Sequence, residues 1–362
     1  MNKNLLAFFP TFFGMRIRAG ILFTSLVLIF GLIVNGVSVA HSVEFGQDAT
    51  GDPNAIDVQG ASGFLYSDRI VFTAAHVIVG VEETTLEEKM QRIAYWERVG
   101  FVYAPGIANR AGQTQYKVKK VLINPSYKPR SATDQTRIDD FAVLVLQESI
   151  QMTNQVVVAS KSDIDTFIKD KSPVHMVGYG LQNPSQRNPS QSGTLSPHKM
   201  TSYLVSNEEL NNYYKNNSQR VRPNQTILDY GVPNSETFGS VCDGDSGAGF
   251  FVEKGSTRYY LGPVGGQQAG IPNCQSASGA TFGNGGGMSG ITATHKFLSL
   301  IKEAESLVAD DKQKEIKKVD EGRIDTLQKK LTITCTKGKL VKKVTAAKPV
   351  CPKGYKKKLS GL

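Results

Sequence analysis

The chain has few of the residues that build metal sites or dense disulfide frameworks. Its 362 residues include four cysteines, five histidines and one tryptophan. The cysteines form no Cys-x-x-Cys unit, so their spacing argues against a structural zinc site. The stretch Gly285–Gly290 fits Gly-x-Gly-x-x-Gly, but no βαβ pattern surrounds it, so it indicates a loop and not a nucleotide site. We therefore expect neither a metal nor an organic cofactor.

The N-terminus has the features of an export signal. An apolar run from Ile21 to Val34 follows Arg16 and Arg18, and Ser38-Val39-Ala40 offers small residues at the offsets that signal peptidase requires. Residues 1–40 are therefore predicted to be a signal peptide. The rival is an uncleaved signal anchor, because the run with its flanks approaches membrane-spanning length. Export also suits the cysteines, which can pair in an oxidising compartment, so we expect a secreted or cell-surface protein.

The most informative stretch is Cys242-Asp243-Gly244-Asp245-Ser246-Gly247. A serine hydroxyl becomes a nucleophile when a neighbouring base takes its proton. Gly244 allows a turn in which the backbone amides of Gly244 and Ser246 point at one spot and form an oxyanion hole. Asp245 is a candidate for a buried carboxylate, which needs a positive partner. Taken alone, such a cluster is more often a surface turn.

Two segments upstream supply a base and an acid. Thr73-Ala74-Ala75-His76 follows the apolar run from Arg69 to Phe72, which predicts a strand that ends in a turn. Asp139 and Asp140 open the β-branched run of residues 141–146, which predicts another strand. Each feature alone is commonly structural, but their joint occurrence in the order His, Asp, Ser is not readily due to chance.

These motifs resemble those of the chymotrypsin-like (trypsin-fold) serine proteases. The resemblance spans roughly residues 43–308, and Val177-Gly178-Tyr179-Gly180 matches the family's Gly-Trp-Gly motif with Tyr for Trp. It implies an all-β fold of two six-stranded antiparallel β-barrels with a C-terminal helix, over residues 41–308. The order His, Asp, Ser excludes an α/β-hydrolase, in which the acid follows the serine in sequence, and Ala248 breaks that family's Gly-x-Ser-x-Gly pattern. We expect a monomeric, bacterial endopeptidase that acts on protein or peptide substrates.

The resemblance assigns roles to individual residues. Ser246 would be the nucleophile, His76 the general base and Asp140 the group that fixes the His tautomer. Asp139 competes with Asp140, but Asp140 directly precedes the family's strand pattern. One departure is Val77, which stands where most members have the cysteine that bridges across the His loop. Packing must therefore hold His76 in place.

Activation and specificity are also implied only by the resemblance. Val43 matches the first residue of mature family members, whose freed amino group pairs with the aspartate before the nucleophile, here Asp245. The pocket floor is Ser240, which carries no charge, so we expect uncharged or apolar P1 side chains. Gly270 and Gly290 are the expected pocket walls. Cleavage after Lys or Arg would require a buried carboxylate at that floor.

The two pairs of cysteines are assigned by the same resemblance. Cys242 corresponds to the family cysteine that pairs across the specificity pocket, and Cys274 is its natural partner. Cys335 and Cys351 then remain as the second pair. They lie in a stretch similar to a small lysine-rich C-terminal module of some secreted bacterial proteins.

The C-terminal part has a different composition. Residues 309–330 are highly charged and are expected to form a linker or solvated helix. Residues 331–362 contain many lysines and no acidic residue, within a chain of formal net charge +10. The simplest interpretation is a soluble basic tail, and the functional one is a module that binds an anionic cell-wall polymer or a membrane surface. Nucleic acid is disfavoured as a partner, although basic charge alone carries no specificity between these polyanions. The alternative function is a catalytically quiescent protease-fold protein that binds such polymers through its tail.

The intervening chain alternates short β-rich runs with polar turns, as expected for paired barrels. One exception is Glu82–Val99, whose apolar residues at spacings of three or four predict a surface helix in which Trp96 packs. Residues 181–197 and 211–225 are predicted to be polar loops.

Overall fold

The computed structural model describes residues 43, 46–80, 85–128, 139–180, 196–216, 229–235, 238–269, 281–282, 285–327 and 331–358. The chain divides into residues 1–40 and 41–362, and only the second unit contains described residues. The expected signal peptide, Gly270 and Cys274 thus lie outside the described part. Within that part, no helix is long and apolar enough to cross a membrane.

The first sheet is six-stranded and antiparallel, in the order β2-β3-β4-β7-β6-β5. Strands β2 and β5 also lie against each other, which curls the sheet into a barrel. All five residues of β7 are buried, because this strand is central and its β-branched and aliphatic side chains pack on both faces. The strands are β2 (Ala55–Val58), β3 (Ala61–Ser67), β4 (Ile70–Thr73), β5 (Phe101–Tyr103), β6 (Gln115–Ile123) and β7 (Ala142–Leu146).

The second sheet has eight strands in the order β1-β10-β9-β12-β13-β16-β11, with β8 paired to β13. A bridge between Val205, just after β10, and Gly231 of β11 closes six of them into a second barrel. Strands β1 and β8 are short additions. The strands are β1 (Gln47–Asp48), β8 (Gln155–Val158), β9 (Pro173–Gly178), β10 (His198–Tyr203), β11 (Tyr230–Pro233), β12 (Gly249–Lys254), β13 (Thr257–Ala269) and β16 (Met288–Ile291); β14 (Thr281–Phe282) and β15 (Gly285–Gly286) form a separate pair.

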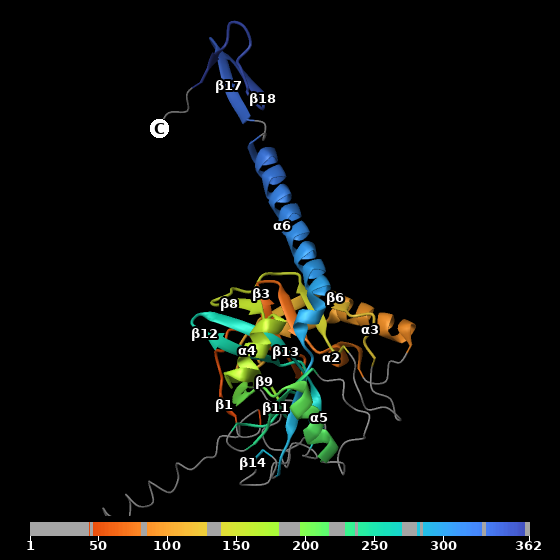
Figure 1. Ribbon diagram of the computed structural model, residues 1–362. Helices are drawn as coiled ribbons and strands as arrows, with labels where there is room; N and C mark the ends of the chain where they lie inside the picture. The colour runs from red at the N-terminus through yellow and green to blue at the C-terminus, as the bar shows by residue number, and fades with distance from the viewer. Residues whose placement is uncertain are drawn as a thin grey trace, which may run out of the picture. The chain divides into compact units, whose positions relative to one another are not determined.

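Aromatic side chains join the two barrels. The ring centroid of Phe64, from β3, lies 4.8 Å from that of Tyr260 and 5.6 Å from that of Phe251, both in the second sheet. Phe72 of β4 is 5.1 Å from Tyr260. Large buried rings contribute heavily to packing, so this cluster fixes how the two sheets face each other. The fold predicted from the sequence is therefore confirmed (Figure 1).

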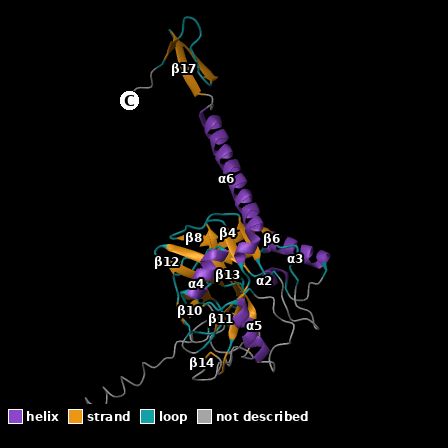
Figure 2. Ribbon diagram, viewed as in Figure 1, coloured by secondary structure: helices purple, strands orange, loops and turns teal. Residues whose placement is uncertain are grey.

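Five α-helices and one 3-10 turn are described beside the strands, and Figure 2 distinguishes helices from strands by colour. They are α2 (Ala75–Val79), α3 (Leu86–Val99), α4 (Lys161–Lys169), α5 (Asn207–Asn216), the 3-10 turn η3 (Thr294–Phe297) and α6 (Leu298–Leu327). Helix α3 lies inside the predicted helical segment, and a capping box between Thr85 and Glu88 fixes its start. Trp96 packs in the core below it. The prediction of a loop over 211–225 is wrong for residues 211–216, which belong to α5, because buried Leu210 packs this helix against Val205.

Helix α6 crosses the expected boundary at residue 308 without a break. Its first turns, with Ile301 and Ala304, are buried in the core shared by the barrels. Farther along, ion pairs tie it to the first barrel. Glu315 accepts from the buried Arg69 at 2.9 Å, Lys312 donates to Asp68 at 2.7 Å, and Asp311 pairs with Lys119.

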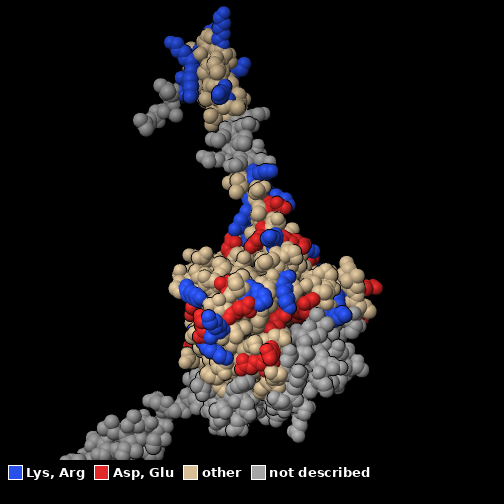
Figure 3. Space-filling view, in the orientation of Figure 1, with Lys and Arg blue, Asp and Glu red and all other residues tan. Residues whose placement is uncertain are grey.

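The tail module is a three-stranded sheet in the order β18-β17-β19, with β17 (Leu331–Lys337), β18 (Leu340–Ala346) and β19 (Lys356–Lys357). The predicted disulfide between Cys335 and Cys351 is present. Cys335 lies in the central strand, beside Lys342 of β18 and Lys357 of β19. The charged side chains visible on this module are lysines (Figure 3).

Candidate active site

Asp140 holds His76 through two hydrogen bonds. The backbone N–H of His76 donates to Oδ1 at 2.9 Å, and the ring Nδ1 lies 2.7 Å from Oδ2. Asp140 is buried, and the His76 side chain is 9 % exposed. Because an ionised carboxylate only accepts, Nδ1 must carry the proton, which leaves the basic lone pair on Nε2.

Strand register explains why these two residues meet. Thr73, the last residue of β4, pairs with Ala142, the first residue of β7. His76 follows Thr73 by three residues, in the first turn of α2, and Asp140 precedes Ala142 by two. The segment after β4 and the segment before β7 therefore lie at the same end of these two paired strands. Asp139 does not share this position: it has φ +54°, and its side chain accepts a hydrogen bond from Ser126.

The segment with Ser246 bridges the two barrels. The Ser246 carbonyl accepts from the Ser62 amide at 3.0 Å, and the Gly247 amide donates to Val264 of β13 at 3.1 Å. Gly247 has φ +85°, and a Cβ there would collide with the Thr73 side chain, so its backbone lies directly against the strand that leads to His76. The Ser246 side chain is partly exposed. Within the described residues no hydrogen bond joins its hydroxyl to the His76 ring.

The turn before Ser246 is bent as expected. Gly244 has φ +96°, a conformation that glycine adopts without strain. The Asp245 amide donates to the Cys242 carbonyl at 3.0 Å, which closes the turn. In the described part of the chain, the amides of Gly244 and Ser246 donate no hydrogen bond. The backbone N–H groups of Gly244 and Ser246 can therefore donate to an external acceptor.

Asp245 is fully buried and is held by backbone amides. Its Oδ1 accepts from the Gly180 amide and its Oδ2 from the Cys242 amide, each at 2.8 Å. A Cβ at Gly178 or Gly180 would collide with this carboxylate, which explains why glycines flank Tyr179. Burial raises the pKa of Asp245 to about 7, although the two amides oppose the shift. No ion pair to Asp245 occurs among the described residues.

The remaining predicted residues lie around this turn. Val43 is buried with φ +56° and contacts the segment of Gly239, next to Ser240. Ser240 is fully buried, and Gly290 lies in β16 opposite Gly231 of β11. Cys242 is disulfide-bonded, whereas its expected partner Cys274 is not among the described residues.

Sequence reasoning missed the contacts that support the turn from the first barrel. The Ser62 hydroxyl donates to the Gly244 carbonyl and accepts from the Tyr179 amide, each at 2.8 Å. Thr73 donates to the Ser62 carbonyl at 2.8 Å. A small polar residue at the start of an apolar strand was the only local signal for Ser62.

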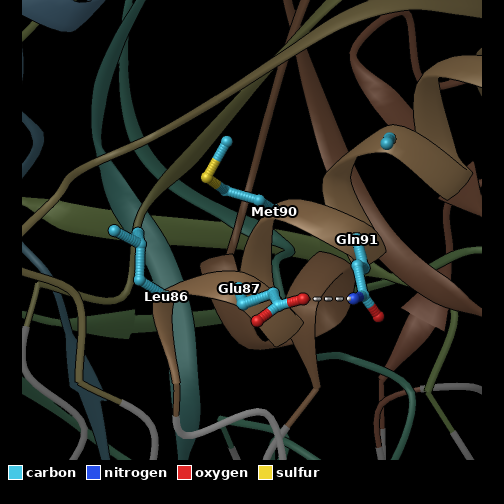
Figure 4. A pocket seen from close by; sticks show the side chains of 5 residues that line it. Leu86, Glu87, Met90 and Gln91 are labelled. Atoms are coloured by element: carbon cyan, nitrogen blue, oxygen red, sulfur yellow. Dashed lines mark hydrogen bonds between the residues drawn. The ribbon is translucent and has the colours of Figure 1, made fainter.

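A shallow hollow of about 520 Å³ lies elsewhere, on helix α3 (Figure 4). It is lined by Leu86, Glu87, Met90, Gln91 and Ala94, and Glu87 accepts from Gln91 at 3.2 Å. None of the predicted site residues borders it. Among the described residues, no group of three or more His, Cys, Asp or Glu side chains is arranged to hold a metal.

Comparison with known proteins agrees with this geometry. No curated protein matches the chain. The family model for trypsin matches residues 46–287, which is 242 of the 362 residues. The matched range contains His76, Asp140 and Ser246, the whole first barrel and the second barrel except β16. The chain therefore belongs to the trypsin family of chymotrypsin-type serine proteases.

Proposed function

We propose that the protein is an active, secreted serine endopeptidase with Ser246, His76 and Asp140 as its catalytic residues. The observation that carries the proposal is the double hydrogen bond from His76 to buried Asp140, beside a turn with two unengaged amides.

The reaction follows from these positions. His76 Nε2 takes the Ser246 proton as Oγ attacks the carbonyl carbon of the scissile peptide. The amides of Gly244 and Ser246 stabilise the oxyanion, and loss of one such donor costs about 3 to 4 kcal/mol. His76 then gives the proton to the leaving amine. Water hydrolyses the acyl-enzyme by the same proton transfers in reverse.

Labelling with a fluorophosphonate tests this function. The wild-type secreted protein should form a covalent adduct, and Ser246→Ala should not. Ser256→Ala, which changes an exposed serine in the turn after β12, is the matched control and should label normally. A folded wild-type protein that does not react would contradict the proposal and favour the quiescent binding protein.

We propose a preference for uncharged or apolar P1 side chains, based on the buried and neutral Ser240. Peptide substrates with Phe, Tyr or Leu at P1 should give higher kcat/KM than those with Lys or Arg. Ser240→Asp should reverse the order, because a buried carboxylate can pair with a basic side chain. An unchanged order in this variant would show that Ser240 does not face the P1 side chain.

We propose that cleavage before Val43 activates the enzyme. Val43 is already buried near Gly239, and buried Asp245 has no ion pair among the described residues, so it can accept the freed ammonium group. N-terminal sequencing of the active secreted form should give Val43 as the first residue. An active form with any other N-terminus would contradict this.

We propose that the tail module binds an anionic cell-wall polymer. Lys342 and Lys357 flank Cys335 on neighbouring strands, and Lys343 and Lys356 lie on the same two strands. Purified cell envelopes should retain the full protein and release it as salt rises, because the contacts are ionic. The double variant Lys342→Gln/Lys357→Gln should elute at lower salt. Preferential binding to anionic vesicles or DNA would contradict a wall polymer as partner.

A further inference from the structure

Ser62 uses every one of its polar groups at the junction between the barrels. Its amide donates to the Ser246 carbonyl, and its carbonyl accepts from the Thr73 hydroxyl. Its hydroxyl accepts from the Tyr179 amide and donates to the Gly244 carbonyl, each at 2.8 Å. The residue is fully buried, so no water can replace these bonds without rearrangement.

The Ser62 hydroxyl binds Gly244, the residue of the turn whose backbone rotates most freely. Gly244 lacks a Cβ and has φ +96°, so its own covalent structure does not fix its peptide planes. The consecutive amides of Tyr179 and Gly180 hold the turn from the end of β9. Gly180 binds Asp245 directly, whereas Tyr179 reaches Gly244 only through the Ser62 hydroxyl.

We propose that Ser62 is a positioning residue of the oxyanion hole. By anchoring the Gly244 carbonyl to the Tyr179 amide, its hydroxyl keeps the Gly244 backbone in the orientation whose N–H faces the reacting carbonyl oxygen. The proposal rests on the proposed protease function and identifies a residue outside the triad on which the rate depends.

Loss of the hydroxyl should affect the transition state and not the bound substrate. Ser62→Ala leaves the Gly244 carbonyl and the Tyr179 amide without a partner in a buried site. Among the described residues, the Gly244–Asp245 peptide is then held only by the bond from the Asp245 amide to Cys242, so the bonds at the Gly244 Cα, which also orient the Gly244 N–H, rotate more easily. Removal of a whole oxyanion donor costs about 10²- to 10³-fold in kcat. A misoriented donor should cost less, so we expect kcat to fall about 10- to 100-fold with KM nearly unchanged.

The test measures kcat, KM and the affinity of a peptide aldehyde. The aldehyde forms a tetrahedral oxyanion on Ser246, so its affinity should fall in parallel with kcat, while a non-covalent product peptide should bind equally well. Ser202→Ala is the matched control, because Ser202 is a buried serine whose hydroxyl donates to the Pro233 carbonyl at 2.8 Å, away from the turn. It should lose stability but not aldehyde affinity.

Three outcomes overturn the role of Ser62 in an enzyme that labels at Ser246. These are an aldehyde affinity and kcat within twofold of wild type, an equal loss in Ser202→Ala, or a change confined to KM. If Ser62→Ala does not fold, Ser62→Cys decides, because its thiol is similar in size to the hydroxyl but is a weak donor. Its kcat and aldehyde affinity should fall together, and values within twofold of wild type would overturn the role. Wild-type protein that does not label overturns the protease function itself, and the proposal for Ser62 with it.

Discussion

Replacing Asp140 with Asn isolates the contribution of one proton on His76. The variant keeps the size of the side chain. Its Oδ1 can still accept from the His76 backbone amide, as it does at 2.9 Å in the wild type. The other terminal atom then becomes an NH₂ group, which faces the ring Nδ1 that lies 2.7 Å from Oδ2 in the wild type. To accept from this NH₂ group, Nδ1 must lose its proton. The proton moves to Nε2, which can no longer accept one from Ser246.

The expected loss in kcat is therefore large, although the geometry is kept. Such a change costs about 10⁴-fold in trypsin-type triads. A factor of 10⁴ corresponds to about 5.5 kcal/mol in activation free energy. The assay is steady-state hydrolysis of an apolar-P1 peptide substrate, together with thermal unfolding to show that the variant is folded.

Asp139→Asn provides the comparison. Asp139 is the adjacent carboxylate, but it interacts with Ser126 and has a positive φ that Asn tolerates. Its kcat should stay within about twofold of wild type, since it does not touch the His76 ring. If Asp140→Asn lost less than tenfold, or if Asp139→Asn lost more than Asp140→Asn, the assignment of Asp140 would be refuted.

Three further perturbations have defined outcomes. Gly247→Ala should lower the free energy of unfolding by about 2 to 4 kcal/mol and abolish fluorophosphonate labelling, because its Cβ collides with Thr73 and Ser62. Gly255→Ala, with open space around its Cβ, should lower it by only about 1 kcal/mol. Equal melting temperatures of the two variants would contradict the collision. In the protein that has not been cleaved before Val43, Asp245 binds its proton more tightly in the native state than in the unfolded chain, because burial raises its pKa to about 7. The free energy of unfolding should therefore fall by on the order of 4 kcal/mol as the pH rises from about 4 to about 7. Denaturant titrations should show this slope and its absence in Asp245→Asn, and a chain with a free Val43 ammonium should lack it too. Cys335→Ser should destabilise the tail module by about 3 kcal/mol and expose it to limited proteolysis without changing kcat; a change in kcat would show that the tail contributes to catalysis.

The reacting groups were predictable because each is marked by a short contiguous motif. Ser246, His76 and Asp140 each sit at the end or start of an apolar run whose strand character is local. The structure adds the register of β4 with β7, which brings His76 and Asp140 together. A pairing between strands so far apart in the chain cannot be derived from either strand alone.

The supporting contacts were not predictable for the same reason. Ser62 is separated from Gly244 by 182 residues and from Tyr179 by 117. A lone serine in a strand carries no signal for either partner. Helix α4 is a different case, because the capping box of Ser160 and Asp163 is a local signal from which this helix could have been predicted.

The uninterrupted helix α6 determines where the protein can be cut without harm. Its buried residues end near Val308, and its ion pairs with the first barrel end at Glu315, whereas Ile316 and Val319 are exposed. A cut on the C-terminal side of Val319 would thus remove the lysine-rich module and keep the buried first turns of α6 and its ion pairs with Arg69, Asp68 and Lys119. On the proposed binding of the tail module to a wall polymer, proteolytic trimming at this helix would convert a retained protease into a freely diffusing one, with a new range of substrates within reach.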